Sequence, residues 1–170
     1  PLIPPDEGQV QQEMERVYRP VRNESGFGWK EIQIGLNRIM QDYCGQYKSK
    51  EILNVGLWFL KTVKDNELRR MTAANPHDLM RAIETDTRLA ADEIIMLASL
   101  GRDTSNPVLD FCRTDCPEGK TEDEYMLALW QQDGTTAYEK MPMDFWLRGE
   151  NAPDYEENYR RCGCLEGRDE

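Results

Sequence analysis

The sequence has 170 residues, of which 39% are hydrophobic and 31% are charged, and its formal net charge is −11. This length is typical of one domain, and the composition excludes an intrinsically disordered chain. The acidic balance argues against nucleic-acid binding, which needs clustered lysine and arginine to contact phosphates. No apolar run reaches the roughly 20 residues of a membrane helix, so we expect no direct membrane insertion.

Cysteine usage and the first residue bear on where the protein works. The five cysteines lack the spacing of a secreted disulfide framework, which favours a reducing, cytoplasmic location. We find no basic-then-apolar signal segment. The sequence begins at Pro1 and not at methionine, which we interpret as a processed product or a part of something longer.

The first third of the chain predicts a linker and three helices. Residues 1–6 are rich in proline, as an interdomain linker is, and a first helix over 7–18 is expected to end at Arg19-Pro20. A second helix is expected over 29–46, and a third begins after Ser49, a good N-cap. The inner faces follow helical spacing: Val10, Met14, Val17 and Tyr18; Ile32, Leu36, Ile39, Met40 and Tyr43; Ile52, Val55, Gly56, Phe59 and Val63. Additional leucines beside the last stripe predict that the third helix is covered on two sides.

The strongest helical signal covers residues 75–102. Asn75 is a good N-cap, Pro76 suits the first helical position, and Gly101 is placed to end the helix. At ~1.5 Å per residue the helix would span roughly 40 Å and form the spine of a small domain. Its apolar face is expected to be formed by six residues at helical spacing: Leu79, Ile83, Thr87, Ala90, Ile94 and Leu97.

A β-hairpin is predicted near residues 123–141. The segments 123–132 and 135–141 alternate loosely between apolar and polar residues, and Asp133-Gly134 lies between them. Asp-Gly between two alternating segments is a strong hairpin signal, because glycine accepts the positive φ of a tight turn.

These elements predict a mainly α fold: a three- or four-helix bundle with a small β-hairpin and an extended C-terminal tail. The domain is expected over residues 7–160. Aromatic residues after residue 142 indicate that the tail lies across the domain, and residues 161–170 are expected to be frayed.

Few residues suggest a reaction centre. His77 is the single histidine, and at the start of the long helix it favours a surface or capping role. Cys44 has no obvious base near it in the sequence. Three carboxylates of the long helix alternate with arginines and indicate an ordinary solvated charged face: Asp86, Asp92 and Glu93.

The remaining cysteines form two close pairs, Cys112-x₃-Cys116 and Cys162-x-Cys164. Four thiolates are enough for zinc or an iron–sulfur cluster. Neither pair has the CxxC spacing, and the pairs lie far apart in the sequence. Free thiols are therefore favoured, and a cysteine-ligated metal protein is the third functional class that we consider.

Two arginine-containing segments follow the long helix, at 102–107 and 113–118. Arginines there could bind an anionic substrate or a phosphate. They could instead be structural: Arg102 would stabilise a helix C-terminus, and Arg113, Asp115 and Glu118 would form a local ion-pair network. We favour the structural interpretation.

The segments NPHDLMRAIETDTRLAADEIIMLASLGRDTS and FCRTDCPE resemble the C-terminal helical domain of the fumarate reductase/succinate dehydrogenase flavoprotein family, which includes the adenylylsulfate reductase α subunit. The family patterns are Arg-x-Glu-Ser-Arg-Gly-x-His and then Arg-x-Asp-Tyr-Pro-Glu. Six positions match: Arg102, Ser105, Arg113, Asp115, Pro117 and Glu118. Four positions differ, and the histidine is missing, which indicates a divergent member: Thr104, Asn106, Pro107 and Cys116.

The resemblance covers residues 10–159 and implies a supporting role. In this family the flavin-binding and capping domains come first in the chain and carry FAD and the substrate-binding residues. The resemblance therefore implies no catalytic or FAD-binding residue here. It implies a domain that packs on the FAD-binding domain of the same parent chain and helps form the surface for an iron–sulfur subunit. We hypothesise interdomain anchoring by four residues: Arg102, Ser105, Arg113 and Asp115.

A second functional class stays open. The chain could be a stand-alone acidic helical module that docks on a basic protein partner. A domain severed from a larger protein should expose an apolar patch, whereas a self-contained module should not.

Overall fold

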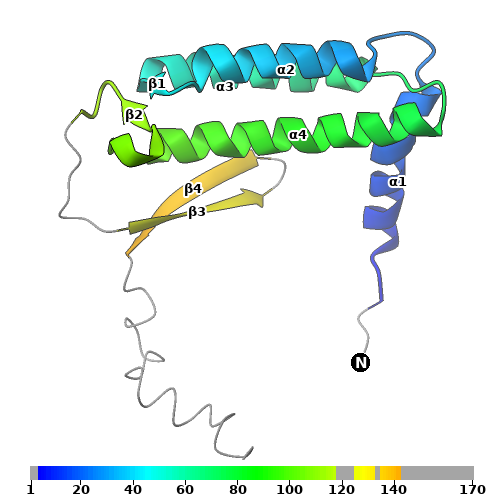
Figure 1. Ribbon diagram of the computed structural model, residues 1–170. Helices are drawn as coiled ribbons and strands as arrows, with labels where there is room; N and C mark the ends of the chain where they lie inside the picture. Colours follow the sequence, from blue (N-terminus) through cyan, green and yellow to red (C-terminus); the bar gives the residue numbers. More distant parts are fainter. Residues whose placement is uncertain (1–3, 118–124, 133–134, 143–170) are drawn as a thin grey trace, which may run out of the picture.

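The protein is described by a computed structural model over residues 4–117, 125–132 and 135–142. The order of its main elements is α1 (Glu7–Arg22), α2 (Trp29–Tyr43), β1 (Tyr47–Lys48), α3 (Lys50–Asp65), η1 (Leu68–Arg70), α4 (Pro76–Gly101), η2 (Pro107–Leu109), β2 (Cys112–Arg113), β3 (Tyr125–Gln132) and β4 (Thr135–Pro142). Helices α2, α3 and α4 lie side by side and alternate in direction, and α1 crosses one end of them (Figure 1). The hairpin β3–β4 packs on α4.

The predicted helical bundle with a small hairpin is confirmed. Asn75 caps α4, because its Oδ1 accepts a hydrogen bond from the Asp78 amide at 2.9 Å, and Ser49 caps α3 in the same way through the Ile52 amide at 3.3 Å. In the hairpin Gln132 pairs with Thr135. The predicted Asp133-Gly134 turn and the extended tail after residue 142 lie outside the described residues.

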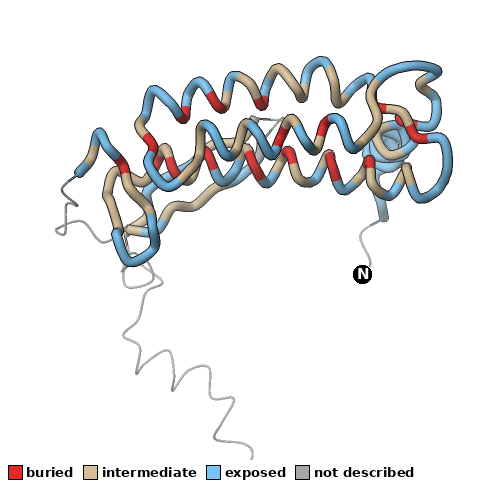
Figure 2. Tube along the Cα trace, turned by 45° about the horizontal axis from the view of Figure 1, so that its top comes forward, coloured by how far each residue is buried: buried red, intermediate tan, exposed pale blue. Residues whose placement is uncertain are grey.

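The buried face of α4 differs from the predicted one. Apart from Gly101 at its end, its buried residues follow spacings of three and four, as in the seam of a coiled coil: Ala82, Thr85, Leu89, Asp92, Met96 and Ser99. They point toward α2 and α3, with buried positions lining the space between the helices (Figure 2). The predicted face was wrong because the helix also contacts α1 and the hairpin on other sides. Apolar residues around its circumference therefore do not single out one face.

The buried face of α3 also differs from the predicted one. The residues buried along it are Leu53, Gly56 and Leu60, whereas two members of the predicted stripe, Ile52 and Val55, are exposed. Trp58 is 60% exposed. Within the described chain α3 is thus open to solvent on one side, and the expected cover on two sides is not formed.

Helix α1 continues through Pro20 to Arg22, beyond the predicted end at residue 18. Proline lacks an N–H, but close to a helix C-terminus this removes a single hydrogen bond. Burial of Pro20 and a 2.8 Å hydrogen bond from the Ala73 amide to its carbonyl hold this turn against the body. The predicted inner face of α1 is wrong at three of its four positions, because Val10, Met14 and Tyr18 are exposed. Val17 alone is half-buried, beside the body.

The two ends of the bundle are closed by short backbone pairings. At one end, β1 pairs with β2 in parallel. This pairing ends α2 at Tyr43, before the predicted residue 46, because Gln46 accepts a hydrogen bond from the Cys112 amide at 3.0 Å. At the other end, Phe27 pairs with Met71 in a parallel bridge, and the Asn23 side chain donates to the carbonyl of Arg69 in η1 and to that of Met71 after it. No helix of the described residues is long and apolar enough to cross a membrane.

The expected solvated carboxylate face of α4 is wrong at Asp92, which lies in the core. Asp92 is 6% exposed, and its buried Oδ2 has no hydrogen-bond partner among the described residues. The nearest cation is Arg88, with Nε 3.9 Å from that oxygen. The loss of water around the carboxylate raises the pKa of Asp92. Asp86 and Glu93 instead pair with Arg16 of α1 and Lys64 of α3.

Asp92→Leu is expected to raise the free energy of unfolding at neutral pH by about 1–2 kcal/mol, because it removes a buried charge without a good partner. The raised pKa means that Asp92 favours folding below its unfolded pKa and loses that contribution as the pH rises through its folded pKa. The increase in unfolding free energy of Asp92→Leu over the wild-type protein should therefore be largest near neutral pH and small in acid. Urea unfolding at several pH values measures this difference; a destabilised variant, or a gain independent of pH, would contradict it.

Candidate functional site

Arg113 organises the loop that follows α4. Its side chain is 3% exposed, and Nη1 donates to the carbonyl oxygens of Ser99 at 2.7 Å, Leu100 at 3.2 Å and Arg102 at 2.7 Å. These carbonyls belong to the last turn of α4 and the residue after it, where oxygens lack intrahelical partners and the helix dipole is negative. Arg113 is therefore a cationic cap of α4. The sequence predicted a role at this helix end for Arg102, whose guanidinium instead contacts the Thr104 hydroxyl and the Phe111 ring.

Asp115 completes this cap. Its carboxylate accepts two hydrogen bonds from Arg113, at 2.9 Å from Nε and 2.8 Å from Nη2. The paired guanidinium holds the pKa of Asp115 well below its usual range. The carboxylate also accepts from the Lys50 amide at 3.0 Å, so it connects the loop to the start of α3. The predicted Arg113–Asp115 ion pair is confirmed, and Glu118 lies outside the described residues.

Ser105 fixes the course of the same loop. Its hydroxyl accepts from the Arg113 amide at 2.9 Å and lies within 2.9 Å of the Cys116 carbonyl oxygen, to which it donates. Both contacts are internal to the loop. The structure thus brings Ser105, Arg113 and Asp115 together in one hydrogen-bonded cluster at the C-terminus of α4.

Arg102, the fourth predicted residue, lies beside this cluster and is half-buried. Its guanidinium carbon is 4.7 Å from the centre of the Phe111 ring, and Lys48 Nζ is 4.5 Å from the same centre. Lys48 is buried although it lies in a two-residue strand. Sequence reasoning missed Lys48 and Phe111, because a cation–π contact between residues far apart in the chain leaves no local pattern.

The hairpin is attached to this region through Asp103. Its carboxylate accepts hydrogen bonds from the Tyr125 hydroxyl at 2.6 Å and from Lys140 Nζ at 2.9 Å. These two donors, the tyrosine first, lower the pKa of Asp103 to about 2. One acidic side chain therefore joins the end of α4 to both strands of the hairpin.

The cysteines form no recognisable site in the described residues. Cys112 and Cys116 are half-buried free thiols, and the Sγ of Cys44 lies 3.8 Å from the Ser99 hydroxyl oxygen. Residues 4–117, 125–132 and 135–142 contain no group of three or more histidine, cysteine, aspartate or glutamate residues able to hold a metal. Cys162 and Cys164 lie outside them, so a shared metal site stays untested.

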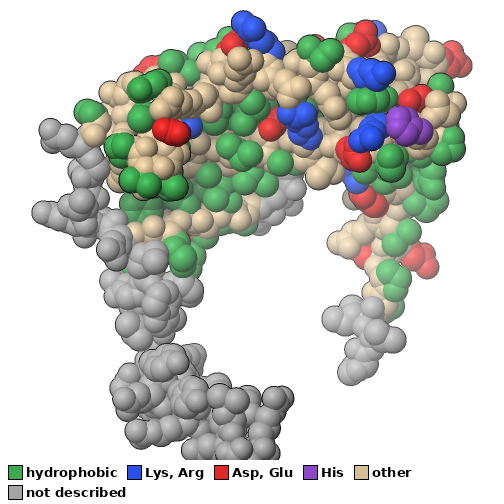
Figure 3. Space-filling view, viewed as in Figure 1, with side chains coloured by type: hydrophobic (Ala, Val, Ile, Leu, Met, Phe, Trp, Pro, Cys, Tyr) green, Lys and Arg blue, Asp and Glu red, His purple; other side chains and the backbone are tan. Residues whose placement is uncertain are grey.

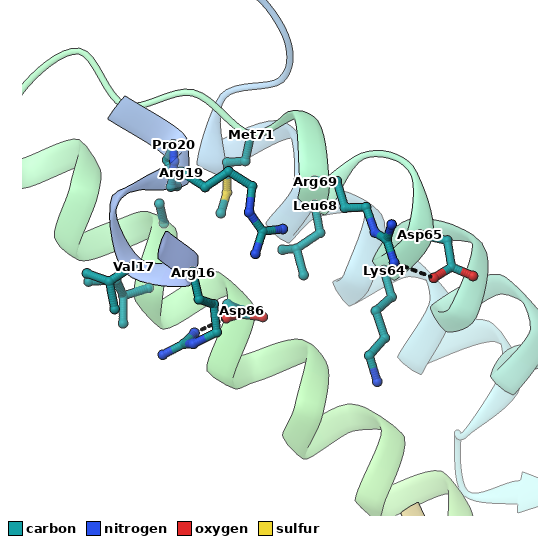
Figure 4. Close-up of a pocket in the computed structure, with 12 residues that line it drawn as sticks. Arg16, Val17, Arg19, Pro20, Lys64, Asp65, Leu68, Arg69, Met71 and Asp86 are labelled. Atoms are coloured by element: carbon teal, nitrogen blue, oxygen red, sulfur yellow. Dashed lines mark hydrogen bonds and ion pairs between the residues drawn. The ribbon is translucent and has the colours of Figure 1, made fainter. Parts of the chain in front are cut away.

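A pocket of about 220 Å³ lies between α1, the end of α3 with η1, and α4. Figure 4 shows Arg16 and Arg19 of α1 on one side and Lys64, Asp65 and Arg69 on the other. Most of its charges are paired: Arg16 with Asp86, Lys64 with Glu93, and Arg69 with Asp65. Within the described chain Arg19 has no ion pair, so the pocket offers one guanidinium and no nucleophile or base.

His77 does not contribute to either region. Its side chain is largely exposed, at the start of α4, and its ring lies 6.4 Å from Trp29 in an edge-on arrangement. The predicted surface role is confirmed. In the part of the chain that the structure describes, no histidine, thiol and carboxylate come together as a catalytic constellation.

Comparisons with known proteins give a match in structure. No family model and no curated protein matches the sequence. Adenylylsulfate reductase from the hyperthermophilic Archaeoglobus fulgidus matches with a TM-score of 0.76 and 21% identity, over 84% of this chain and 25% of that chain. E. coli quinol fumarate reductase matches with a TM-score of 0.67 and 20% identity, over 80% and 24%. The Mycobacterium smegmatis Sdh1 complex gives 0.65 and 17%, over 82% and 25%.

The chain has the fold of one domain of these reductases. The resemblance inferred from the sequence is therefore confirmed at the level of the fold. The chain spans about a quarter of the length of the proteins that it matches.

Proposed function

We propose that this chain is the C-terminal helical domain of a FAD-dependent oxidoreductase related to the fumarate and adenylylsulfate reductases. The observation that supports this is the structural match of 84% of the chain to a quarter of the Archaeoglobus enzyme. In this proposal the parent protein passes electrons between FAD and a small anionic substrate. The helical domain packs on the flavin domain and helps form the surface for an iron–sulfur subunit.

The residues of this chain do not fit FAD themselves. The pocket between α1, α3 and α4 is lined by no glycine, so its backbone does not offer the close approach that a dinucleotide pyrophosphate needs. The sequence also lacks the glycine-rich strand–turn–helix unit that holds a dinucleotide pyrophosphate. We therefore assign FAD to another part of the parent chain and no step of the reaction to these residues.

Exposed apolar side chains favour a domain of a larger assembly over a self-contained acidic module. Trp58 on α3 and Val10 and Met14 on α1 are all more than 45% exposed. Large apolar surfaces on soluble proteins usually mark contact sites. The module that docks alone on a basic partner is the weaker alternative.

Reading the native gene upstream of the Pro1 codon tests the proposal. Several hundred further codons in frame, with a strand–GxGxxG–helix unit, are expected. The purified native protein should then contain FAD, detected by its absorbance after acid release. A start codon directly before Pro1, or a longer protein without flavin, would overturn it.

The anchoring hypothesis places the loop after α4 at the contact with the flavin domain. Arg113 and Ser105 are held inside the loop, so in this hypothesis they and Asp115 fix its shape. Arg102 carries the charge that can reach a partner, because it is half-buried and has no ion pair among the described residues.

Arg102→Gln in the full parent protein is expected to weaken domain association, because it removes this charge. The domain should become separable at lower urea concentration, as measured by protease cleavage of the native protein between the two domains. Arg38→Gln removes an exposed arginine of α2 that pairs within its own helix, and it is the matched control. Equal cleavage profiles for both variants would exclude anchoring by Arg102 without affecting the assignment of the parent protein.

A further inference from the structure

The pocket between α1, the end of α3 with η1, and α4 contains a guanidinium without a partner. Arg19, in the last turn of α1, is half-buried, and within the described chain its side chain forms no ion pair or hydrogen bond. A last-turn arginine can bind the carbonyl oxygens of its own helix, but no such bond is formed among these residues. Figure 4 instead shows the side chain extending from α1 toward Leu68, into the pocket. The five N–H donors of Arg19 are therefore open to an acceptor that enters the pocket.

The acidic side chains at this pocket are already bound to other cations. Asp86 is paired with an arginine of α1. Asp65 accepts a hydrogen bond from Lys61 Nζ at 2.8 Å, whereas Arg69 Nη2 lies 3.7 Å from its carboxylate, too far for a hydrogen bond. Arg69 and Arg19 line this pocket and a second hollow together. A second guanidinium is thus available to an acceptor that binds Arg19.

The attraction for an anion is local to this pocket. The whole chain has a formal net charge of −11, and Figure 3 shows basic side chains interspersed with acidic ones on the visible face. General attraction of anions to such a surface is weak at physiological ionic strength. A ligand must therefore gain its affinity from contacts inside the pocket.

Apolar side chains from three elements form the rest of the lining: Val17 and Pro20 of α1, Leu68 of η1 with Met71 after it, and Ala82 and Ile83 of α4. The volume is about 220 Å³, far above the roughly 10–15 Å³ that one water needs. The hydrocarbon part of a ligand would be favourably buried against this lining. An inorganic anion would leave the lining uncovered, and a neutral apolar molecule would leave Arg19 without an acceptor.

We propose that this pocket binds a small organic anion, a carboxylate with a short hydrocarbon body. The carboxylate accepts two hydrogen bonds from the Arg19 guanidinium, the paired geometry that arginine offers to carboxylates. Arg69 supplies a second positive charge near the carboxylate, and the hydrocarbon body packs on Leu68 and Ile83. No reaction is assigned to the pocket, and its ligand binding does not rest on the proposed reductase function.

Titration of the nitrogen-15-labelled chain with hexanoate at low ionic strength, followed by NMR amide shifts, tests the binding. Hexanoate is expected to bind with a dissociation constant of about 1 mM, the order expected for a ligand of this size. The amides that shift should be those around the pocket in α1, η1 and α4. Acetate lacks most of the hydrocarbon body and hexan-1-ol lacks the charge, so each should bind at least about tenfold more weakly.

Three variants locate the ligand. Arg19→Gln should raise the dissociation constant for hexanoate by roughly tenfold, because the charge and the paired donors are lost. Arg38→Gln removes an exposed arginine that pairs within α2, and this matched control should leave the constant unchanged. Ile83 is half-buried at the pocket, and Ile83→Phe should also raise the constant roughly tenfold, because the larger ring fills space that the ligand needs. The dispersion of the amide signals checks that each variant is folded.

Several results would overturn this assignment. One is the lack of a saturable shift at roughly 20 mM hexanoate, about twenty times the expected dissociation constant. Another is an equal affinity for inorganic phosphate or for hexan-1-ol, which would exclude an organic anion as the preferred ligand. Equal constants for Arg19→Gln and Arg38→Gln, or an Ile83→Phe constant equal to the wild-type one, would place the hexanoate outside this pocket.

Discussion

Arg113→Met is expected to lower the free energy of unfolding by about 3 kcal/mol. The substitution removes five hydrogen bonds of one side chain that is 3% exposed. It leaves Asp115 without its cation and the carbonyl oxygens at the end of α4 without a donor. The carbonyl oxygens are the costly part, above all the buried Ser99 oxygen, because water replaces their lost bonds poorly. The Asp115 side chain is 27% exposed and can regain water.

Urea unfolding followed by circular dichroism measures this loss, and two further variants define its cause. Arg113→Lys keeps the charge but cannot donate in the planar fork that Asp115 and the three carbonyls require, so it should recover little of the stability. Arg38→Met removes an arginine whose side chain is 73% exposed and should change the stability by less than about 0.5 kcal/mol. An Arg113→Met loss no larger than the Arg38→Met loss would show that the cluster contributes little.

The Arg113 result also bears on how the anchoring hypothesis can be tested. If Arg113 holds the loop in shape, removing it disturbs any surface that the loop presents, whether or not Arg113 touches a partner. A weakened association in an Arg113 variant therefore carries no information about direct contact. Among the described residues, the side chain of Arg102 contacts only the Thr104 hydroxyl and the Phe111 ring. A substitution at Arg102 can therefore distinguish a direct contact with the partner domain from a change in the loop conformation.

Local signals in the sequence predicted local features of the fold. The caps at Ser49 and Asn75 and the hairpin after residue 123 each depend on residues close together in the chain. A capping side chain bonds to an amide two or three residues away, so its pattern can be read without knowing the fold. The motif residues Arg113 and Asp115 were also predicted as an ion pair, because they lie two residues apart.

Features that depend on packing could not be read in this way. The inner faces of α3 and α4 were misassigned because both helices have apolar residues around much of their circumference, and only the position of neighbours decides which are buried. Arg19-Pro20 predicts a helix end, but tertiary contacts of Pro20 carry α1 past it to Arg22. Asp92 looked like part of a charged surface, since its sequence neighbours gave no sign that α2 and α3 cover it.

Gly56→Val is expected to lower the free energy of unfolding by about 3 kcal/mol, at the upper end of the cost of overpacking a core. Gly56 is buried on the side of α3 that faces α2 and α4. A Cβ atom there would lie 2.7 Å from the Cβ of Tyr43 and 2.8 Å from the Cε of Met96. The end of Met96 can move aside, but the Tyr43 Cβ is attached to the α2 backbone, so the two helices must separate.

Intrinsic helix propensity works against this loss and is too small to offset it. Replacing glycine within a helix gains at most about 1 kcal/mol from the reduced freedom of the unfolded chain, and less for a β-branched residue such as valine. Gly35→Val is the matched control, because Gly35 also lies inside a helix and a Cβ there would meet nothing within 4 Å. Thermal or urea unfolding should place Gly35→Val within about 0.5 kcal/mol of the wild-type protein. Equal losses of unfolding free energy at the two glycines would contradict the prediction. They would mean that α2, α3 and α4 are not in close contact at Gly56.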